Sequence, residues 1–143
     1  MTGDDPWDLA RFVAAQDDGN TYEHAVGELR CGRKTRHWMW FVFPQIAGLG
    51  RSAMSRHFAI SSLDEARAYL AHPVLGPRLL ACAGILATAG EAPAEEVLGE
   101  IDAMKLRSSM TLFALALPDE PVFRRVLDLH FGGRADPATE AIV

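Results

Sequence analysis

Long apolar runs, cysteines and a secretory leader are scarce or missing in this sequence. No apolar run approaches the roughly 18 residues that a membrane-spanning helix requires. The two cysteines, Cys31 and Cys82, are too few for a disulfide framework and are expected to stay reduced. The start, Met1 to Trp7, holds two aspartates but no basic residue and no apolar stretch, unlike a signal peptide. These absences argue against membrane association or a disulfide scaffold and favour a cytoplasmic protein.

No linker, internal repeat or low-complexity stretch interrupts the 143 residues of the chain. Hydrophobic residues make up 49% of the sequence and charged residues 23%, which is typical of a folded globular protein rather than a disordered one. A chain of this length can bury a sizeable core and still form one domain. We therefore expect a single domain over residues 1–143.

Periodic apolar residues and capping signals predict about seven or eight short helices joined by short loops. Asp5-Pro6 and Asp136-Pro137 each place an N-cap residue before a proline at the first helical position. Ser62 and Glu65 form a capping box. The helices are expected over residues 6–16, 21–31, 63–72, 75–88, 95–98, 101–117 and 122–131, with a short turn from residue 136 onwards.

Two further features of these helices are predicted from the pattern. Gly90 is expected to end the helix over 75–88, since glycine adopts the left-handed conformation found after helix ends. The longest helix, over 101–117, carries a stripe of residues at helical spacing that is expected to face the core. The members of this stripe are Ile101, Met104, Ser108, Leu112 and Leu115.

Helical periodicity is absent between residues 33 and 51. The run from Trp38 to Phe43 is continuously apolar and is followed by Pro44, which fits either a buried strand or a buried turn of helix. With no second strand candidate in the chain, we favour a buried helical turn or an extended segment. The pattern as a whole predicts a compact all-α domain that is neither a regular up-down bundle nor a solenoid.

Charge is distributed unevenly along the chain. Between Glu28 and Asp64 there are six basic residues and no acidic one, whereas the rest of the sequence holds 19 acids against 8 bases. The same stretch contains Trp38, Trp40 and three phenylalanines. Such segregation predicts a local positive field that attracts an anion. The alternative is a basic surface patch that pairs with acidic helices elsewhere in the fold.

Several segments resemble the signature of a bacterial family known as domain of unknown function 1810. They are GRKTRHWMWFVFPQIAGLGRS at 32–52, AYLAHPVLGPRLL at 68–80, IDAMKLRSSMTLF at 101–113 and GGRADPAT at 132–139. The resemblance covers essentially the whole chain and implies a small, mainly helical fold. Some members carry a calpastatin label, but nothing in this chain looks like a protease inhibitor. The family implies no activity and no catalytic residue.

The basic, aromatic segment 33–52 is the first candidate site. Guanidinium and ammonium groups are suited to anions, indole faces stack on bases, and the backbone near Gly48 and Gly50 could present N–H groups to a phosphate. The candidate ligand-binding residues are Lys34, Arg36, His37, Trp38, Trp40, Gln45, Arg51 and Ser52. The alternative is that both tryptophans belong to the core and the basic residues surround them.

A second candidate site lies on the helix over 101–117. Asp102, Lys105 and Ser109 are spaced to share one helix face, and a lysine beside a serine is the arrangement of a Ser–Lys dyad. The competing interpretation is an ordinary ion pair between Asp102 and Lys105, with Ser108 directed to the core. If chemistry occurs, we expect Asp102, Lys105 and Ser109 to lie across the same pocket as the basic segment.

Other classes of function are not supported by the sequence. His24, Cys31 and His37 lack the spacing of a zinc site, so no metal is expected, and no motif indicates a cofactor. There is no nucleophile elbow of the GxSxG type. A pI near 5.5 is unlike that of a nucleic-acid-binding domain. The sequence favours binding of an anionic, nucleotide-like or phosphorylated small molecule; the alternative is a module that docks an acidic protein partner through the same segment. Whether the protein is an enzyme is left open.

Overall fold

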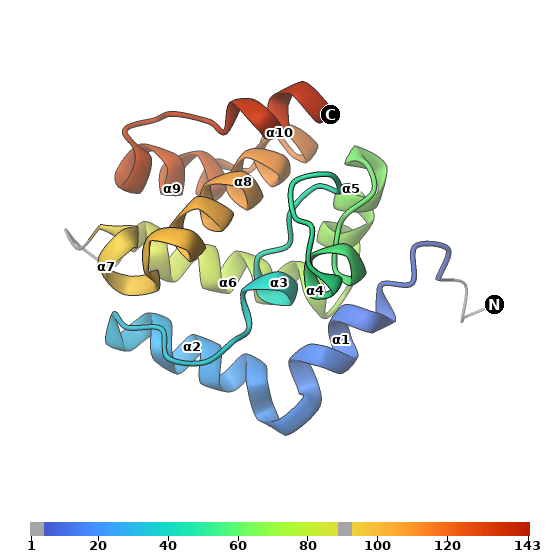
Figure 1. Ribbon diagram of the computed structural model, residues 1–143, viewed down its shortest axis with the longest axis horizontal. Coiled ribbons are helices and arrows are strands. Elements are labelled where there is room, and N and C mark those ends of the chain that lie inside the picture. Colours follow the sequence, from blue (N-terminus) through green and yellow to red (C-terminus); the bar gives the residue numbers. More distant parts are fainter. Residues whose placement is uncertain (1–4, 89–92) are drawn as a thin grey trace.

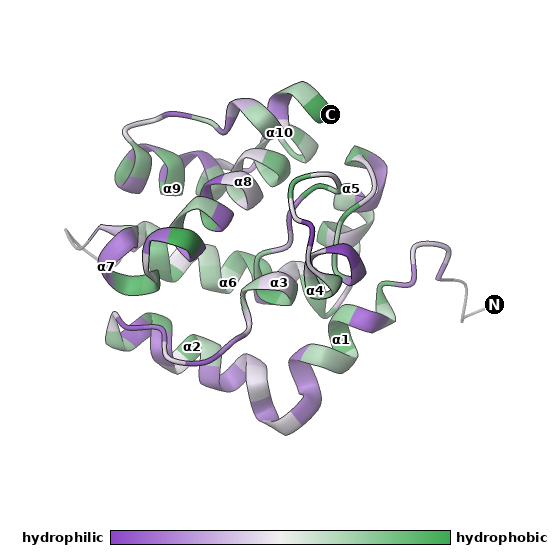
Figure 2. Ribbon diagram, in the orientation of Figure 1, coloured by the Kyte–Doolittle hydropathy of each residue, from purple (hydrophilic) through white to green (hydrophobic). Residues whose placement is uncertain are grey.

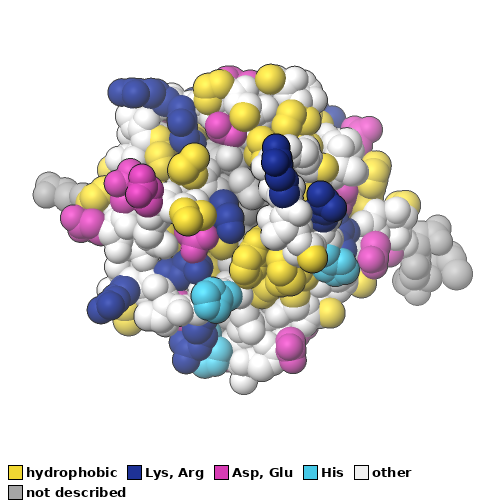
Figure 3. All heavy atoms as spheres, in the orientation of Figure 1, with side chains coloured by type: hydrophobic (Ala, Val, Ile, Leu, Met, Phe, Trp, Pro, Cys, Tyr) yellow, Lys and Arg dark blue, Asp and Glu magenta, His cyan; other side chains and the backbone are white. Residues whose placement is uncertain are grey.

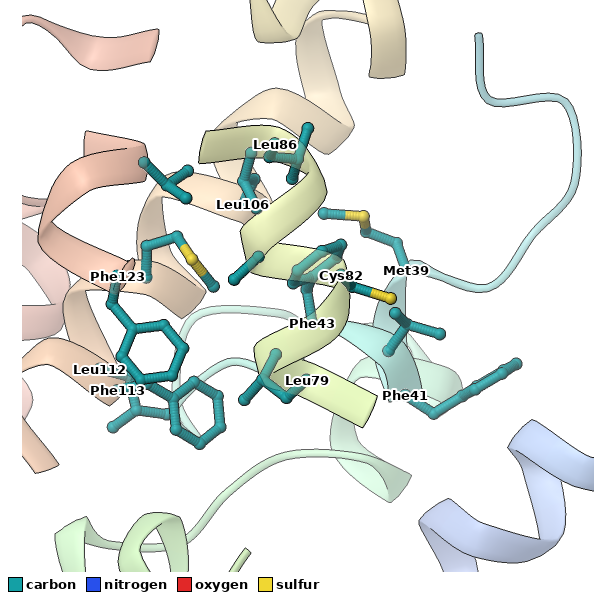
Figure 4. Packing of buried hydrophobic residues seen from close by; sticks show 14 of the residues in the cluster. Met39, Phe41, Phe43, Leu79, Cys82, Leu86, Leu106, Leu112, Phe113 and Phe123 are labelled. Carbon is teal, nitrogen blue, oxygen red and sulfur yellow. The ribbon is translucent and has the colours of Figure 1, made fainter. Parts of the chain in front are cut away.

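Helix α6 (Leu75–Thr88) lies in the middle of the hydrophobic core in the computed structural model, which describes residues 5–88 and 93–143. Its sequence is almost wholly apolar, so Leu79, Cys82 and Leu86 are buried on successive turns. Side chains from α3 (Met39–Val42), α8 (Glu100–Ala116) and α9 (Pro121–Phe131) surround it (Figure 4). One continuous cluster of buried hydrophobic residues results.

The remaining helices lie on the two sides of α6 (Figure 1). The first side holds α1 (Ala10–Asp17), the 3₁₀ turn η1 (Asp18–Asn20) and α2 (Thr21–Cys31). The other side holds α8, α9 and α10 (Pro137–Ile142), with α7 (Ala94–Leu98) packed on α8. Helices α4 (Ala53–His57) and α5 (Leu63–Ala71) complete the chain between α3 and α6. The prediction of an all-α fold is confirmed.

The eight segments predicted as helical correspond to α1, α2 and α5 to α10, and the predicted caps at Ser62 and Asp136 are confirmed, whereas Asp5 does not occupy the N-cap position of α1. The Asp5 carboxylate accepts hydrogen bonds from the N–H groups of Leu9 (2.8 Å) and Ala10 (2.9 Å). Ser62 Oγ accepts from Glu65 N at 3.1 Å, and Asp136 accepts from Thr139 N at 3.2 Å. The first helix begins at Ala10 rather than at Pro6, because the backbone turns at Asp8, where φ is 51°.

The segment without periodicity forms two single helical turns, α3 and α4, joined by a loop. Of the alternatives for the run 38–43, the buried helical turn is correct. The loop is tied back by Ala47 N donating to Ile60 O and Ile60 N donating to Gln45 O, both at 2.8 Å. Ile46 and Ile60 thus form an isolated parallel β-bridge, and the described ranges contain no strand pairing longer than this one. Figure 2 shows hydrophilic residues along the connection from α2 to α3 and hydrophobic ones along α6.

The predicted inward stripe of α8 is wrong at its start. Ile101 is 72% exposed and Met104 is 68% exposed, while Ala103, Leu106 and Met110 are buried instead. Helix α8 packs against α5, α7, α9 and α10, so its sequence is apolar on several faces and periodicity alone does not select one register. Among the stripe residues, Ser108 and Leu112 are buried and Leu115 is exposed.

Two predictions concern residues that the structure does not describe. Gly90, expected to end α6, and residues 1–4, part of the start that is unlike a signal peptide, lie outside the described ranges. Within those ranges, no single helix is both long and apolar enough to cross a membrane. Helices α5 and α6 together are long and apolar enough, but the angle between them is 92°.

Candidate functional site

The basic connection between α2 and α3 is held from inside by Glu28, on the last turns of α2. The Glu28 carboxylate accepts hydrogen bonds from the backbone N–H groups of Thr35 (2.7 Å) and Arg36 (3.0 Å), from Arg36 Nη1 (2.8 Å) and from Trp38 Nε1 (3.0 Å). Burial of the carboxyl opposes its ionisation, but these four donors outweigh burial and lower the pKa of Glu28 to about 2. The segment is therefore fixed in place before α3 begins.

The short helix α3 separates the two tryptophans of the segment. Trp38 is fully buried, with its indole N–H on Glu28 and its ring 6.2 Å from that of Phe43. Trp40, two residues later, is half-buried and lines a surface pocket. Its indole nitrogen is buried and finds no hydrogen-bond partner among the described residues. Only Trp40 is thus available as an aromatic wall.

The sequence contains only two lysines, Lys34 and Lys105, and the fold brings both to one carboxylate. Lys34 Nζ lies 2.8 Å from Asp102 Oδ2, and Lys105 Nζ lies 3.7 Å from Asp102 Oδ1. Lys105 Nζ also lies 4.8 Å from the centre of the Trp40 ring, in a cation–π arrangement. All three charged side chains are largely buried, with exposed fractions of 8% for Lys34, 19% for Asp102 and 22% for Lys105.

These groups line a pocket of about 450 Å³, called here the α8 pocket. Figure 3 shows one face of the molecule, on which basic, acidic and histidine side chains gather near the centre beside hydrophobic ones. The other walls of the α8 pocket are the junction of α7 and α8 and the side chain of His37. The lining residues are Lys34, His37, Met39, Trp40, Leu98, Gly99, Glu100, Ile101, Asp102 and Lys105.

The start of α8 opens into this pocket. Gly99 occupies the N-cap position with φ of 88° and, having no side chain, cannot cap the helix. The N–H groups of the first turn of a helix have no partner within the helix and carry partial positive charge. Glu100 and Asp102 sit in this first turn, so the lining holds two carboxylates and two ammonium groups. The pocket therefore offers hydrogen-bond donors to an anion, and it also offers hydrogen-bond acceptors to hydroxyl groups.

Two smaller hollows continue from the α8 pocket, one adjoining it and the other adjoining the first. The first, of about 280 Å³, shares Ile101 and Lys105 with it and is also lined by Gln45, Ser55 and Asp136. The second, of about 260 Å³, shares Gln45 and Ser55 with the first and reaches the backbone near Gly48. Residues from the segment 33–52 thus line all three hollows.

The comparisons with known proteins agree with this architecture. The family described as "Protein of unknown function (DUF1810)" matches residues 6–143. The chain belongs to this family. A solved DUF1810-like structure, the conserved hypothetical protein Rv1873 from Mycobacterium tuberculosis, determined by crystallography at 1.38 Å, is 49% identical and has a TM-score of 0.94. The similarity covers 97% of this chain and 98% of that one. Among curated proteins, no sequence matches.

The structure of this DUF1810 chain brings some of the predicted site residues together. Lys34, His37, Trp40, Asp102 and Lys105 share the α8 pocket, as the sequence-based hypothesis of a common pocket requires for these five. Gln45 lies in the adjoining hollow. Residues of the basic segment and of the helix over 101–117 therefore meet, although about 70 positions separate them in the sequence.

Other predicted site residues lie elsewhere. The Arg36 guanidinium is engaged by Glu28, and the Trp38 indole is in the core. Arg51 is exposed and lines none of the three hollows. Ser52 caps α4, with its Oγ accepting from Ser55 N at 3.1 Å. Ser109 is fully buried and its hydroxyl has no partner within the described part of the chain, so no Ser–Lys dyad is formed.

The sequence-based reasoning missed the contribution of the α7–α8 junction. Gly99 and Glu100 were available as a signal, since a glycine directly before an acidic residue is a recognised helix start. The predicted start of α8 at residue 101 places Gly99 and Glu100 in a loop, so neither is expected at the site. Met39, in the run expected to be buried, is buried and also lines the pocket.

Proposed function

We propose that this protein binds a small phosphorylated, nucleotide-like ligand in the α8 pocket and acts in the cytoplasm of a bacterial cell. The observation that carries the proposal is the convergence of both lysines of the chain on Asp102, beside the Trp40 ring. The solved relative from Mycobacterium tuberculosis and the two free cysteines within the described residues support the cellular setting.

Lys105 is the cation best placed to bind the phosphate. Lys34 makes the shorter contact with Asp102, 2.8 Å against 3.7 Å for Lys105, and an ammonium group has three donors. Lys105 therefore keeps donors for an incoming anion. The uncapped first turn of α8 adds backbone N–H groups and the positive end of the helix dipole, an arrangement that favours phosphate.

The remaining groups of the pocket suit the rest of a nucleotide. The carboxylates of Glu100 and Asp102 can accept hydrogen bonds from ribose hydroxyls. The half-buried Trp40 ring offers a face on which a base can stack, a contact worth about 1–3 kcal/mol. Since the lining holds as many carboxylates as ammonium groups, the pocket is better matched to a phosphate that carries hydroxyls and a ring than to a bare anion.

The first experiment is a thermal-shift series with inorganic phosphate, ribose 5-phosphate, AMP and ATP. A ligand present at 100 times its dissociation constant stabilises the fold by about 2.7 kcal/mol. We expect AMP or ATP to raise the Tm of the native chain, and the shift to disappear in Lys105→Ala. Arg125→Ala, which removes an exposed charge on α9, is the matched control and should retain the full shift.

A second readout uses the scarcity of lysine. Because the sequence contains only Lys34 and Lys105, an amine-reactive reagent followed by mass spectrometry reports directly on the α8 pocket. The bound ligand should slow the labelling of Lys105. If no phosphorylated compound shifts Tm or protects Lys105, the proposed function is wrong.

A second candidate function is docking of an acidic protein partner at the same place. It is favoured by the exposure of Ile101 (72%) and Met104 (68%) beside the two lysines. An exposed apolar pair next to positive charge is typical of an interface. Under this alternative, Ile101→Ser would abolish binding of an acidic peptide, while nucleotides would leave Tm unchanged.

A further inference from the structure

Lys105 lies at the junction of two hollows rather than at the bottom of one. Together with Ile101 it lines both the α8 pocket and the adjoining hollow of about 280 Å³. The walls that α8 provides extend from Gly99 to Ser108. At 1.5 Å of rise per residue, that part of the helix is roughly 14 Å long. The binding surface is thus an elongated groove with a cation near its middle.

The adjoining hollow carries its own polar groups. The half-buried Gln45 lines this hollow, and its carboxamide can donate and accept hydrogen bonds. Ser55 Oγ, which is bonded to Ser52 Oγ at 2.9 Å, has remaining capacity. The Oδ2 atom of Asp136, in contrast, already accepts hydrogen bonds from Ser108 and Thr139.

The shape of this hollow is set by a close approach of the loop to α4. A Cβ added at Gly50 would collide with the side chain of Ser55, so only glycine fits against α4 there. Ser55 and Gln45 are consequently held next to each other along the groove. Gln45 and Ser55 thus line the adjoining hollow, Trp40 lines the α8 pocket, and Lys105 lines both.

We propose that the ligand has two parts joined through a phosphate or diphosphate, as in a dinucleotide. One ring and ribose occupy the α8 pocket beside Trp40, the linking phosphate binds Lys105, and the second polar moiety lies against Gln45 and Ser55. This inference rests on the proposed function of the α8 pocket and adds the class of ligand. A mononucleotide held in the α8 pocket alone would make no contact with Gln45, which lines the adjoining hollow and not that pocket.

Isothermal titration calorimetry with AMP and with NAD⁺, a dinucleotide probe, tests the inference. We expect NAD⁺ to bind at least about tenfold more tightly than AMP. Gln45→Ala should weaken NAD⁺ binding about fivefold or more and leave the affinity for AMP within about twofold. Lys105→Ala should weaken both ligands, and Arg125→Ala neither. The Tm of each ligand-free variant checks that the fold is retained.

The outcomes separate the inference from the proposed function. If AMP binds as tightly as NAD⁺, or Gln45→Ala weakens both ligands equally, the two-part ligand is wrong although the α8 pocket still binds nucleotides. If AMP binds and NAD⁺ does not, the groove is closed to the longer ligand and the inference is also overturned. If neither ligand binds and no other phosphorylated compound shifts Tm, both proposals fail.

Discussion

The Trp38 indole donates a 3.0 Å hydrogen bond to the Glu28 carboxylate, and both side chains are buried. Glu28 simultaneously accepts from the backbone of Thr35 and Arg36. One ionised carboxylate thus fixes the basic connection that leads to Lys34 and Trp40. Trp38 and Arg36 both donate to Glu28, and neither lines the α8 pocket.

Glu28→Ala should destabilise the fold strongly. The substitution leaves four donors without their acceptor, and removing one member of a buried charged network costs about 3 kcal/mol. Urea denaturation monitored by circular dichroism gives the change in the free energy of unfolding. Glu23→Ala, at an exposed position in the first turn of the same helix, is the control and should change this free energy by less than about 1 kcal/mol. A loss below 1 kcal/mol for Glu28→Ala would contradict the proposed role.

The same carboxylate predicts how stability depends on pH. Its pKa falls from 4.5 in the unfolded chain to about 2 in the folded protein, so the folded state holds the proton less tightly. The stabilisation is therefore complete above pH 4.5 and is lost as the pH falls towards 2. The amount involved is on the order of 3 kcal/mol. The difference in unfolding free energy between the native chain and Glu28→Gln should shrink over this window; a difference that is constant from pH 6 to pH 2.5 would contradict the lowered pKa.

Two glycines of α6 should respond to alanine in opposite ways. A Cβ at Gly76 would collide with the backbone carbonyl of Leu70, at the sharp bend between α5 and α6, whereas a Cβ at Gly84 would meet nothing within 4 Å. We expect Gly76→Ala to destabilise the protein by about 1–3 kcal/mol or more. Gly84→Ala should stabilise it by about 0.5–1 kcal/mol, because alanine favours the helix. Urea midpoints of the two variants test the pair, and shifts of the same sign would contradict this packing.

Much of the fold was predictable because local signals and tertiary structure agree. The caps at Ser62 and Asp136 mark real helix starts, since a side chain that satisfies orphan N–H groups acts over a few residues. The buried register of α8 was not predictable in this way. Its sequence is apolar on several faces, and only the placement of four neighbouring helices shows that Ile101 and Met104 face outwards.

The types of residue in the candidate site could be predicted from the sequence, but not which of the candidate residues line the pocket. Positive charge, an aromatic ring and spacing along the chain indicate Lys34, Trp40 and Lys105. The same criteria also indicate Arg36 and Trp38. What separates the two groups is Glu28, whose four hydrogen bonds depend on the path of the chain after α2. Arg51 carries the same charge, yet it is exposed and lines none of the three hollows.

Asp102 should control which anions the α8 pocket accepts. Its carboxylate neutralises Lys34 at 2.8 Å and lies 3.7 Å from Lys105, so it competes with any incoming phosphate for the two ammonium groups. Asp102→Asn removes this charge with little change of volume, and inorganic pyrophosphate should then bind about three- to tenfold more tightly at low salt. The gain should fade as ionic strength rises, because the interaction is electrostatic.

The same substitution should not strengthen AMP binding to the same degree. It relieves the repulsion between the Asp102 carboxylate and the phosphate, but it also removes a carboxylate that accepts a hydrogen bond from a ribose hydroxyl. Calorimetric titration of both ligands into the native chain and into Asp102→Asn measures the two effects. Asp64→Asn, which removes a charge that is 78% exposed on α5, is the control for net charge and should leave both affinities unchanged. If Asp64→Asn raises the affinity for pyrophosphate as much as Asp102→Asn does, the anion responds to the overall charge of the protein and not to this pocket.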